Sequence, residues 1–307
     1  MKILYAIQGT GNGHLSRAAE ILPHLQNHGE VDIFVSGCNS ELNLPYLVKY
    51  RNRGISFCSG KRGGINYWES MIQFRPFHFM RDVFNFPVEK YDLILNDFEP
   101  VTAWACRLKH RQCIGMGHQA SFLSEKTPRP LKRNNFSEKL LVHFAPVCEY
   151  VGFHFCRYDH LIYTPVIKKS IRESEVLKRD HFTVYLPAYA DNFLIKILNR
   201  VDEVSWEIFS KSCYRRQQFK NVTLFPVTAE GFNKSMISCD GVLCGAGFET
   251  PAEAMFLKKK LMVILMKGQY EQACNGAALN KMGVKTLRSF DTSCHHEVLE
   301  WIQSSSH

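Results

Sequence analysis

The sequence contains no C-x-x-C pair, although it has eleven cysteines. Structural zinc sites and thioredoxin-like redox motifs commonly use such pairs, so both are disfavoured. The cysteines are also odd in number and scattered from Cys38 to Cys294. A secreted disulfide framework would be even and clustered. We therefore expect free thiols and a reducing compartment.

Long apolar segments are absent as well. The longest wholly apolar run near the C-terminal half is 261–266, whereas a membrane-spanning helix needs about 20 apolar residues. Residues 1–7 lack a cleavage-site pattern and indicate a first strand, not a signal peptide. Zinc-finger spacing and aromatic RNA-binding motifs are missing, so no nucleic-acid partner is expected. We expect a cytoplasmic protein that is soluble or peripheral on the inner face of the membrane.

Charge of one sign is in excess. The chain has 307 residues with 38 Lys and Arg against 29 Asp and Glu, a net charge of +9. Basic residues cluster at 107–111, 129–133 and 168–179. Most of them are expected on solvated faces, but the excess favours an anionic partner such as a phosphate group or an acidic membrane.

Short apolar segments alternate with helical patterns, which is typical of parallel sheets covered on both faces. In the N-terminal half we predict strands at 2–7, 31–36, 91–96 and 112–116, with helices from Leu15 and over 101–109. The pattern restarts with strands at 182–186, 205–209, 222–225, 241–244 and 261–265 and helices at 193–201 and 250–257. The fold class is therefore α/β, with Rossmann-like domains at 1–160 and 181–307 and a charged linker at 161–180.

A glycine-rich segment, GTGNGH, follows the first predicted strand at residues 9–14. Amides at the start of the next helix would attract anions. The spacing departs from G-x-G-x-x-G, and Asp32 precedes the apolar core of its strand, so a dinucleotide site is disfavoured. The alternative is a tight turn that His14 caps.

A second glycine-containing segment, GAGFETPAE, spans residues 245–253 between a predicted strand and a helix. Ligands of open parallel sheets bind beyond the carboxyl ends of the strands, where this segment lies. Thr250, Pro251 and Glu253 form a capping-box pattern with proline at the first helical position. Free amides at such a helix start suit a diphosphate. Glu253 either caps its helix or accepts hydrogen bonds from ribose hydroxyls.

The C-terminal segment 245–279 resembles the sugar-nucleotide signature of GT-B glycosyltransferases, most of all the branch related to the peptidoglycan N-acetylglucosaminyltransferase. The signature reads G-x-G-x-x-T-x-x-E-A, then an apolar strand and a polar loop ending in Q-x-x-N. Its counterparts here are Gly245, Gly247, Thr250, Glu253, Ala254, Gln272 and Asn275. GTGNGH is similar to the glycine loop of that group, whose histidine faces the acceptor. The resemblance covers essentially the whole chain and implies two Rossmann-like domains that face each other across a cleft.

The resemblance also implies an activity, namely inverting, metal-independent transfer of a hexosyl or N-acetylhexosaminyl group to an acceptor hydroxyl. The donor would be a nucleotide-sugar, usually a UDP-sugar in this group; it is a substrate, so no cofactor is expected. The residues implied to bind the donor are Gly245, Ala246, Gly247, Phe248 and Thr250 at the diphosphate, Glu253 at the ribose, Glu271 and Gln272 at the sugar, Asn275 bracing their loop, and Phe225 to Val227 at the base. Leu265 stands where relatives commonly have proline, which leaves the donor sugar open.

An inverting transfer needs a base that takes a proton from the acceptor. His14 is our predicted base, and Asp97, at the end of a neighbouring strand, would orient its imidazole. Gly11, Asn12 and Gly13 would form the acceptor-side loop, and His118 is a second candidate base. Two alternatives remain. Asp97 could cap a loop, or Asp97 and Glu99, two residues apart on an extended chain, could hold a divalent metal.

The acceptor is suggested only by residues 65–87, where aromatic residues alternate with Arg75, His78 and Arg81. This stretch is either core or an apolar, basic-rimmed patch for an anionic membrane, which would suit a lipid-linked acceptor. Two other functions stay open. A sugar-nucleotide 2-epimerase would need further acid–base carboxylates and no acceptor, and a non-catalytic sensor would bind the sugar nucleotide without turnover.

Overall fold

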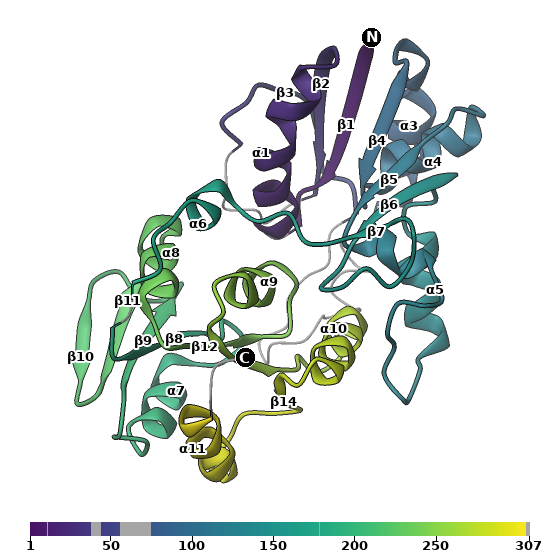
Figure 1. Cartoon of the computed structure of the whole chain (residues 1–307). Coiled ribbons are helices and arrows are strands. Elements are labelled where there is room, and N and C mark those ends of the chain that lie inside the picture. Colours follow the sequence, from purple (N-terminus) through teal and green to yellow (C-terminus); the bar gives the residue numbers. More distant parts are fainter. Residues whose placement is uncertain (11, 38–43, 56–74, 178, 305–307) are drawn as a thin grey trace. The chain divides into compact units, whose positions relative to one another are not determined.

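The computed structural model describes residues 1–10, 12–37, 44–55, 75–177 and 179–304 (Figure 1). The chain forms two compact units, one with most of residues 1–168 and the other from Lys169 onward. Residues of the predicted linker divide between them, because β7 (Ile162–Tyr163) belongs to the first sheet and α6 (Lys169–Arg172) packs on α8 (Ala229–Ser238). The cysteines that the structure describes are free thiols.

The first unit is built on a seven-stranded parallel sheet with the order β3-β2-β1-β4-β5-β6-β7. Its other strands are β1 (Lys2–Gln8), β2 (Glu30–Ser36), β3 (Val48–Asn52), β4 (Leu93–Asp97), β5 (Ile114–Gly117) and β6 (Glu149–Phe153). The sequence pattern did not predict β3, β6 or β7. β3 reads VKYRN and has no buried residue, so it carries no apolar run.

Helices cover both faces of this sheet (Figure 1). They are α1 (Asn12–Gln26), α3 (Pro76–Asn85), α4 (Pro100–Leu108) and α5 (Asn135–His143), with short 3-10 turns η1 (Val88–Lys90) and η2 (Gln119–Leu123). Successive residues of β1 point to opposite faces. Tyr5 and Ile7 therefore pack with Leu15 of α1, whereas Leu4 and Ala6 pack with residues of α3 and α4.

The second unit repeats this plan on a sheet with the order β10-β11-β9-β8-β12-β13-β14, in which only the β10–β11 pair is antiparallel. Its strands are β8 (His181–Tyr185), β9 (Ser205–Ser210), β10 (Gln217–Phe219), β11 (Val222–Pro226), β12 (Gly241–Gly245), β13 (Lys260–Ile264) and β14 (Lys285–Leu287). Helices α7 (Asp191–Leu198) and α11 (His295–Gln303), the latter after the 3-10 turn η3 (Thr292–Cys294), pack on one face around Trp206 and Trp301. Helices α8, α9 (Glu249–Phe256) and α10 (Tyr270–Lys281) lie on the other side in Figure 1.

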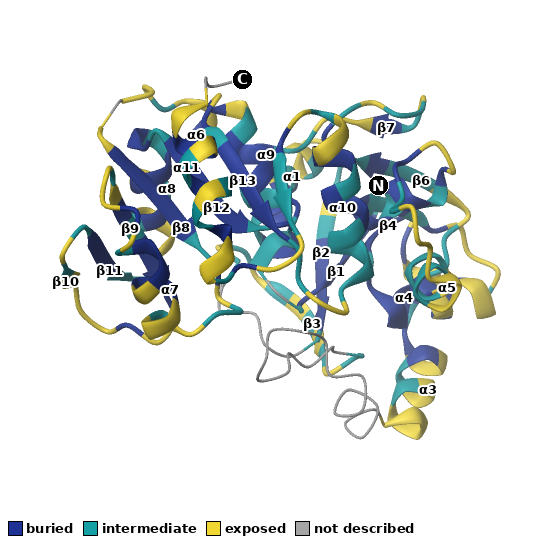
Figure 2. Ribbon diagram, turned by 90° about the horizontal axis from the view of Figure 1, so that it is seen from below, coloured by how far each residue is buried: buried dark blue, intermediate teal, exposed yellow. Residues whose placement is uncertain are grey.

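Strand order places a binding edge in each unit. In the first sheet the chain runs outward from β1 through β2 to β3, and then returns to β4 on the other side of β1. The carboxyl ends of β1 and β4 thus border a topological switch point, where ligands of such sheets bind. The second sheet has the same arrangement at β8 and β12. These central strands are the buried, dark-blue ribbons of Figure 2. The predicted α/β fold with two Rossmann-like units is confirmed.

Candidate active site

A tight turn between β4 and α4 fixes the position of Asp97. Asn96 donates from Nδ2 to the Glu99 carbonyl over 2.7 Å and to Thr102 Oγ1 over 2.8 Å, and its Oδ1 accepts from Glu99 N over 2.9 Å. Phe98, between the two carboxylates, has φ of 58°. This left-handed conformation is uncommon for a non-glycine residue and persists where surrounding contacts enforce it. The Asn96 hydrogen bonds are those contacts, and they hold Asp97 at the end of β4.

His14 and Asp97 meet at this edge of the sheet. His14 lies in the first turn of α1, and its Nδ1 is 2.8 Å from Asp97 Oδ1. Arg17, three residues further along α1, donates from Nε to Asp97 Oδ2 over 3.1 Å and from Nη2 to both carboxylate oxygens over 2.9 Å. Arg17 Nη2 is also 3.2 Å from His14 Nδ1. The exposed fractions of His14, Arg17 and Asp97 are 9%, 3% and 0%, so the three form a buried cluster.

The charges in this cluster compensate one another. Burial alone would raise the pKa of Asp97, but the Arg17 guanidinium and the His14 imidazole outweigh burial and hold that pKa below its ordinary value. An ionised carboxylate can only accept hydrogen bonds, so the 2.8 Å contact with Asp97 Oδ1 requires a proton on His14 Nδ1. We assign the proton to Nδ1 on this ground, which leaves a lone pair on Nε2. The arrangement can orient an imidazole as a proton acceptor.

Two neighbours complete the packing of the cluster. The Phe98 ring lies parallel to the His14 imidazole, with ring centroids 6.5 Å apart and planes 4° apart. Gly117, at the end of β5, faces Asp97 Oδ1 so closely that a Cβ there would overlap the carboxylate. The ion pair therefore depends on a residue without a side chain at this position.

Arg17 is the member of this site that sequence reasoning missed. The available signal for Arg17 was its spacing of three residues from His14, which puts both side chains on one face of a helix.

The rest of the predicted acceptor-side loop lies around this cluster. Gly11 lies outside the described residues, and Asn12 and Gly13 form the first turn of α1. His118 follows β5 and is 1% exposed, and its Nδ1 is 3.0 Å from the Phe153 carbonyl. The structure shows His118 packed against Phe122, with ring centroids 5.1 Å apart.

The metal alternative fits this site poorly. Asp97 directs its carboxylate to Arg17 and His14, whereas Glu99 accepts from Ser36 Oγ, Thr102 Oγ1 and the backbone amides at the start of α4. The two carboxylates therefore have separate partners, and a cation at Asp97 would meet the Arg17 guanidinium. Burial raises the pKa of Glu99 despite these hydrogen bonds, which favours its neutral form. Within the part of the chain that the structure describes, no group of three or more His, Cys, Asp or Glu residues could hold a metal ion.

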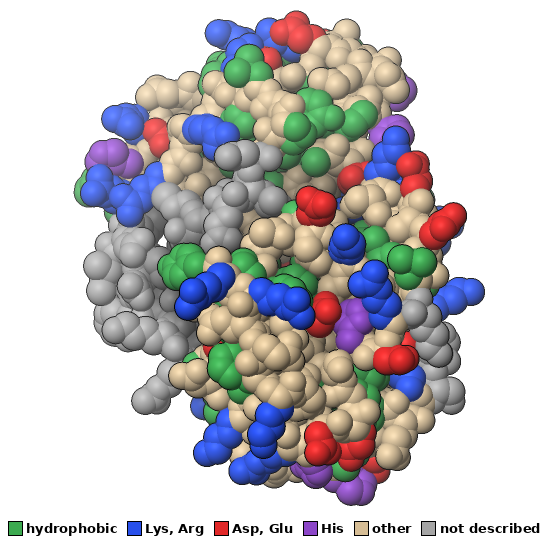
Figure 3. Space-filling model, turned by 90° about the vertical axis from the view of Figure 1, so that its left-hand side faces the viewer, with side chains coloured by type: hydrophobic (Ala, Val, Ile, Leu, Met, Phe, Trp, Pro, Cys, Tyr) green, Lys and Arg blue, Asp and Glu red, His purple; other side chains and the backbone are tan. Residues whose placement is uncertain are grey.

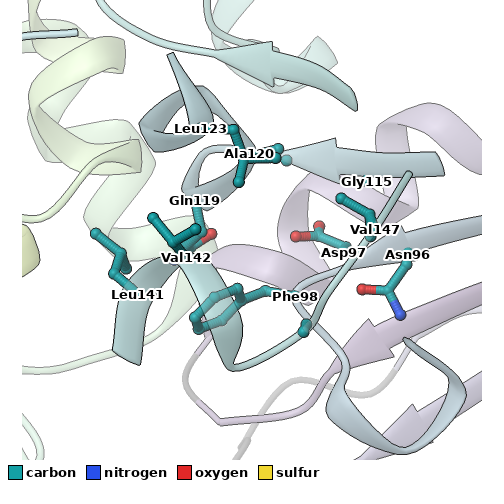
Figure 4. Close-up of a pocket in the computed structure, with 12 residues that line it drawn as sticks. Asn96, Asp97, Phe98, Gly115, Gln119, Ala120, Leu123, Leu141, Val142 and Val147 are labelled. Carbon is teal, nitrogen blue, oxygen red and sulfur yellow. The ribbon is translucent and has the colours of Figure 1, made fainter. Parts of the chain in front are cut away.

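A pocket opens beside Asp97 in the same unit (Figure 4). Figure 4 shows the Asp97 carboxylate directed into this region, with the Phe98 ring and the α5 side chains Leu141 and Val142 on another side. The lining is mostly apolar.

In the second unit, the GAGF segment joins β12 to α9. The predicted capping box is wrong, because α9 begins at Glu249 and Phe248 is its N-cap without a side-chain hydrogen bond. Thr250 and Pro251 therefore lie inside the first turn, where proline is tolerated since those amides have no intrahelical partner. Glu253 is 2% exposed on this helix. A Cβ at Gly247 would meet no described atom within 4 Å, so the backbone there is approachable.

The polar loop residues lie at the start of α10 and support the GAGF segment. Asn275 was expected to brace the polar loop; its Nδ2 donates to the Ala246 carbonyl over 3.2 Å and so ties α10 to the GAGF segment. Gln272 accepts from Met266 N over 3.2 Å. Glu271 is in the first turn of α10. These contacts put the predicted diphosphate and sugar residues next to each other.

The predicted base-binding residues end β11. Phe225 stacks on Phe209 with ring centroids 5.5 Å apart, and the Arg216 guanidinium lies 5.5 Å from the centre of the Phe225 ring. Val227 N–H donates to the Ser210 carbonyl over 3.1 Å. The amide of Val227 is thus already used within the unit.

Comparisons with known proteins agree with this architecture. A family model described as glycosyl transferase family 1 matches residues 1–300. MurG of Acinetobacter baumannii is similar in structure, with a TM-score of 0.61 at 14% identity over 99% of this chain and 90% of that one. The spinosyn forosaminyltransferase SpnP has a TM-score of 0.61 at 12% identity, over 100% of this chain and 91% of that one. Arabidopsis thaliana UGT89C1 complexed with quercetin has a TM-score of 0.62 at 11% identity, over 99% of this chain and 90% of that one. A search of curated proteins finds no match. The solved structures show the predicted GT-B fold.

Proposed function

We propose a reaction for this chain on the premise that it belongs to glycosyl transferase family 1 and is a glycosyltransferase. The proposed reaction moves a hexosyl or N-acetylhexosaminyl group from a UDP-sugar to an acceptor hydroxyl, with inversion and without a metal ion. The contact between His14 Nδ1 and Asp97 Oδ1, 2.8 Å long at the switch point of the first sheet, is the observation that carries the proposal.

In this reaction the acceptor hydroxyl gives its proton to His14 Nε2 as its oxygen attacks the anomeric carbon of the donor. The bond between that carbon and the diphosphate oxygen breaks, and UDP leaves with the bonding electron pair. Attack on the side opposite the leaving group inverts the anomeric carbon. Asp97 keeps the imidazole oriented and stabilises the charge that the ring acquires.

The second unit supplies the donor side of the proposal. The open space at Gly247 and the amides at the start of α9 suit a diphosphate, since a helix N-terminus favours negative charge. These amides can stabilise the leaving UDP without a metal ion, and the partners of Asp97 and Glu99 leave no chelating pair there. Transfer that continues in EDTA supports this part of the proposal, and transfer that EDTA abolishes contradicts it.

We expect Glu253→Gln to weaken UDP binding. In the proposal its carboxylate accepts from ribose hydroxyls, and a hydrogen bond to a charged group contributes about 1.5–3 kcal/mol. The dissociation constant, measured by calorimetry, should therefore rise roughly tenfold or more. Glu230→Gln, on the exposed start of α8 in the same unit, is the matched control. Unchanged affinity in Glu253→Gln would assign this residue a purely structural role.

The membrane proposal concerns α3, since residues 65–74 of the predicted aromatic stretch lie outside the described residues. No helix among the described residues is long and apolar enough to cross a membrane. α3 buries Val83, but Phe77, Met80 and Phe84 are 88%, 45% and 53% exposed on it. Figure 2 shows its exposed residues in yellow. This spacing gathers the three side chains along one side of the helix.

Basic groups accompany this apolar side, because Arg75 and Arg81 are exposed at α3. On the face drawn in Figure 3, basic side chains lie among acidic, hydrophobic and uncharged ones. An apolar stripe with basic flanks suits the interface of an anionic membrane. We therefore infer a cytoplasmic enzyme that is peripheral on the inner face of the membrane and takes a lipid-linked acceptor.

Sedimentation with phosphatidylglycerol vesicles tests this inference. We expect binding at low salt that is lost at high salt, since the attraction to anionic lipid is screened. The variant Phe77→Ser/Phe84→Ser should bind about a hundredfold more weakly or worse, because burying each phenylalanine contributes about 1.5–3 kcal/mol. Tyr214→Ser, 91% exposed in the second unit, should bind like the wild type. Absence of vesicle binding by the wild type at low salt would remove the support for a lipid-linked acceptor.

A further inference from the structure

Arg17 has no part in the proton transfer itself, yet it makes more hydrogen bonds to Asp97 than His14 does. We propose that Arg17 is a positioning residue that keeps the His14 imidazole uncharged, and so able to accept a proton, while it holds Asp97 in place. This inference rests on the proposed function of His14 as the base.

Two oppositely charged side chains lie beside the same nitrogen of the His14 imidazole. Asp97 Oδ1 is 2.8 Å from His14 Nδ1, and a negative charge there favours the protonated ring. Arg17 Nη2 is 3.2 Å from the same nitrogen, and a like charge there disfavours the protonated ring. The guanidinium stays charged in proteins. Both neighbours are buried, so water screens neither charge much, and the two charges act on the imidazole in opposite directions.

The cluster would behave differently without the guanidinium. Without Arg17, His14 would be the group that compensates the buried negative charge of Asp97. The imidazole would then hold a second proton, and the two residues would form an imidazolium–carboxylate pair. The ring would then carry its proton up to a higher pH and could not act as a base until that proton left. Arg17 counteracts this effect, because its charge compensates Asp97 and disfavours a second proton on the imidazole.

Other titratable groups near this edge are occupied elsewhere. Glu99 follows Asp97 by two residues, but its oxygens accept from Ser36, Thr102 and the start of α4. His118, after β5, has its Nδ1 3.0 Å from the Phe153 carbonyl. The Phe98 ring, which is uncharged, stacks on the imidazole. Arg17 and Asp97 are thus the charged groups that the structure gives as direct partners of His14.

The test follows the titration of the His14 imidazole by NMR in the full chain with ¹³C-labelled histidine. The resonance is assigned by its absence in His14→Ala among the 13 histidines. Arg17→Gln keeps hydrogen-bond donors but removes the charge, and its titration midpoint should move to higher pH by about 1–3 units. Arg17→Lys keeps the charge, and its midpoint should stay closer to that of the wild type. An unchanged midpoint in folded Arg17→Gln would overturn the proposal.

A second pair of variants keeps the test decisive if Arg17→Gln does not fold. In Asp97→Asn alone, the Arg17 charge beside the imidazole is uncompensated and disfavours the protonated ring. Adding Arg17→Gln removes that charge as well, so the titration midpoint of His14 should be higher in the double variant than in Asp97→Asn. Equal midpoints in that pair would contradict the proposal. No substrate enters these measurements, so they succeed or fail independently of transfer.

In transfer assays the acid limb of the pH–rate profile should move to higher pH in Arg17→Gln, whereas a purely structural loss would lower the rate at every pH.

Discussion

His14→Ala should slow transfer by about 10²–10⁴-fold, the usual contribution of a general base. UDP affinity should remain near that of the wild type, because the residues proposed to hold the donor belong to the other unit. Single-turnover transfer and calorimetry with UDP measure the two quantities separately. A loss in the chemical step without a loss in binding is the pattern of a residue that acts in the transition state.

Two matched histidine variants make this result specific. His24→Ala changes an exposed histidine on the same helix and should transfer like the wild type. His118→Asn tests the second candidate base and should not reproduce the loss, because its Nδ1 faces the Phe153 carbonyl. Full turnover by His14→Ala would remove this histidine from the mechanism and leave GTGNGH as a structural turn.

Asp97→Asn should have the second-largest effect, on both activity and stability. The amide cannot hold the imidazole in the same tautomer as a carboxylate does, so transfer should fall on the order of 10²–10⁴-fold. It also leaves the Arg17 guanidinium, 3% exposed, without its compensating charge. Breaking a buried ion pair by removing one partner costs about 3–5 kcal/mol of unfolding free energy. Denaturant unfolding and single-turnover transfer measure the two losses.

The double variant Asp97→Asn/Arg17→Gln separates these two losses. It leaves no buried charge, so much of the unfolding free energy should return while transfer stays slow. Adding Asp97→Asn to His14→Ala should lower the transfer rate very little further, because the effects of residues that act as a unit are not additive. A double variant that regains transfer together with stability would show that Asp97 matters only for folding.

The position of the His14–Asp97 pair could be predicted from the sequence because strand ends decide it. Both residues follow apolar strand patterns, and the carboxyl ends of neighbouring parallel strands share one edge. Arg17 could not be found in the same way. An arginine on a predicted helix is usually solvated, and only the packing of Leu15 and its neighbours against the sheet shows that this turn of α1 is buried over β4.

The start of α9 shows a second limit of prediction from the sequence. Thr250, Pro251 and Glu253 fit a capping box, yet the helix starts at Glu249. Proline is compatible with any position in the first turn, so its presence alone leaves the start of the helix undetermined by two residues. β3 was missed for a related reason. Pairing with a neighbouring strand defines it, and its sequence VKYRN lacks the apolar run that marks a buried strand.

Acceptor-dependent release of UDP distinguishes sugar transfer from epimerisation and from binding without turnover. Wild-type protein and His14→Ala would be incubated in EDTA with a panel of UDP-sugars, each with and without a membrane lipid extract. We expect at least one UDP-sugar to yield UDP only when the lipid is present, with the sugar recovered on the lipid in inverted configuration, and we expect His14→Ala to abolish this release. An epimer formed without acceptor, or UDP-sugar bound tightly with no UDP released over any acceptor, would contradict this expectation.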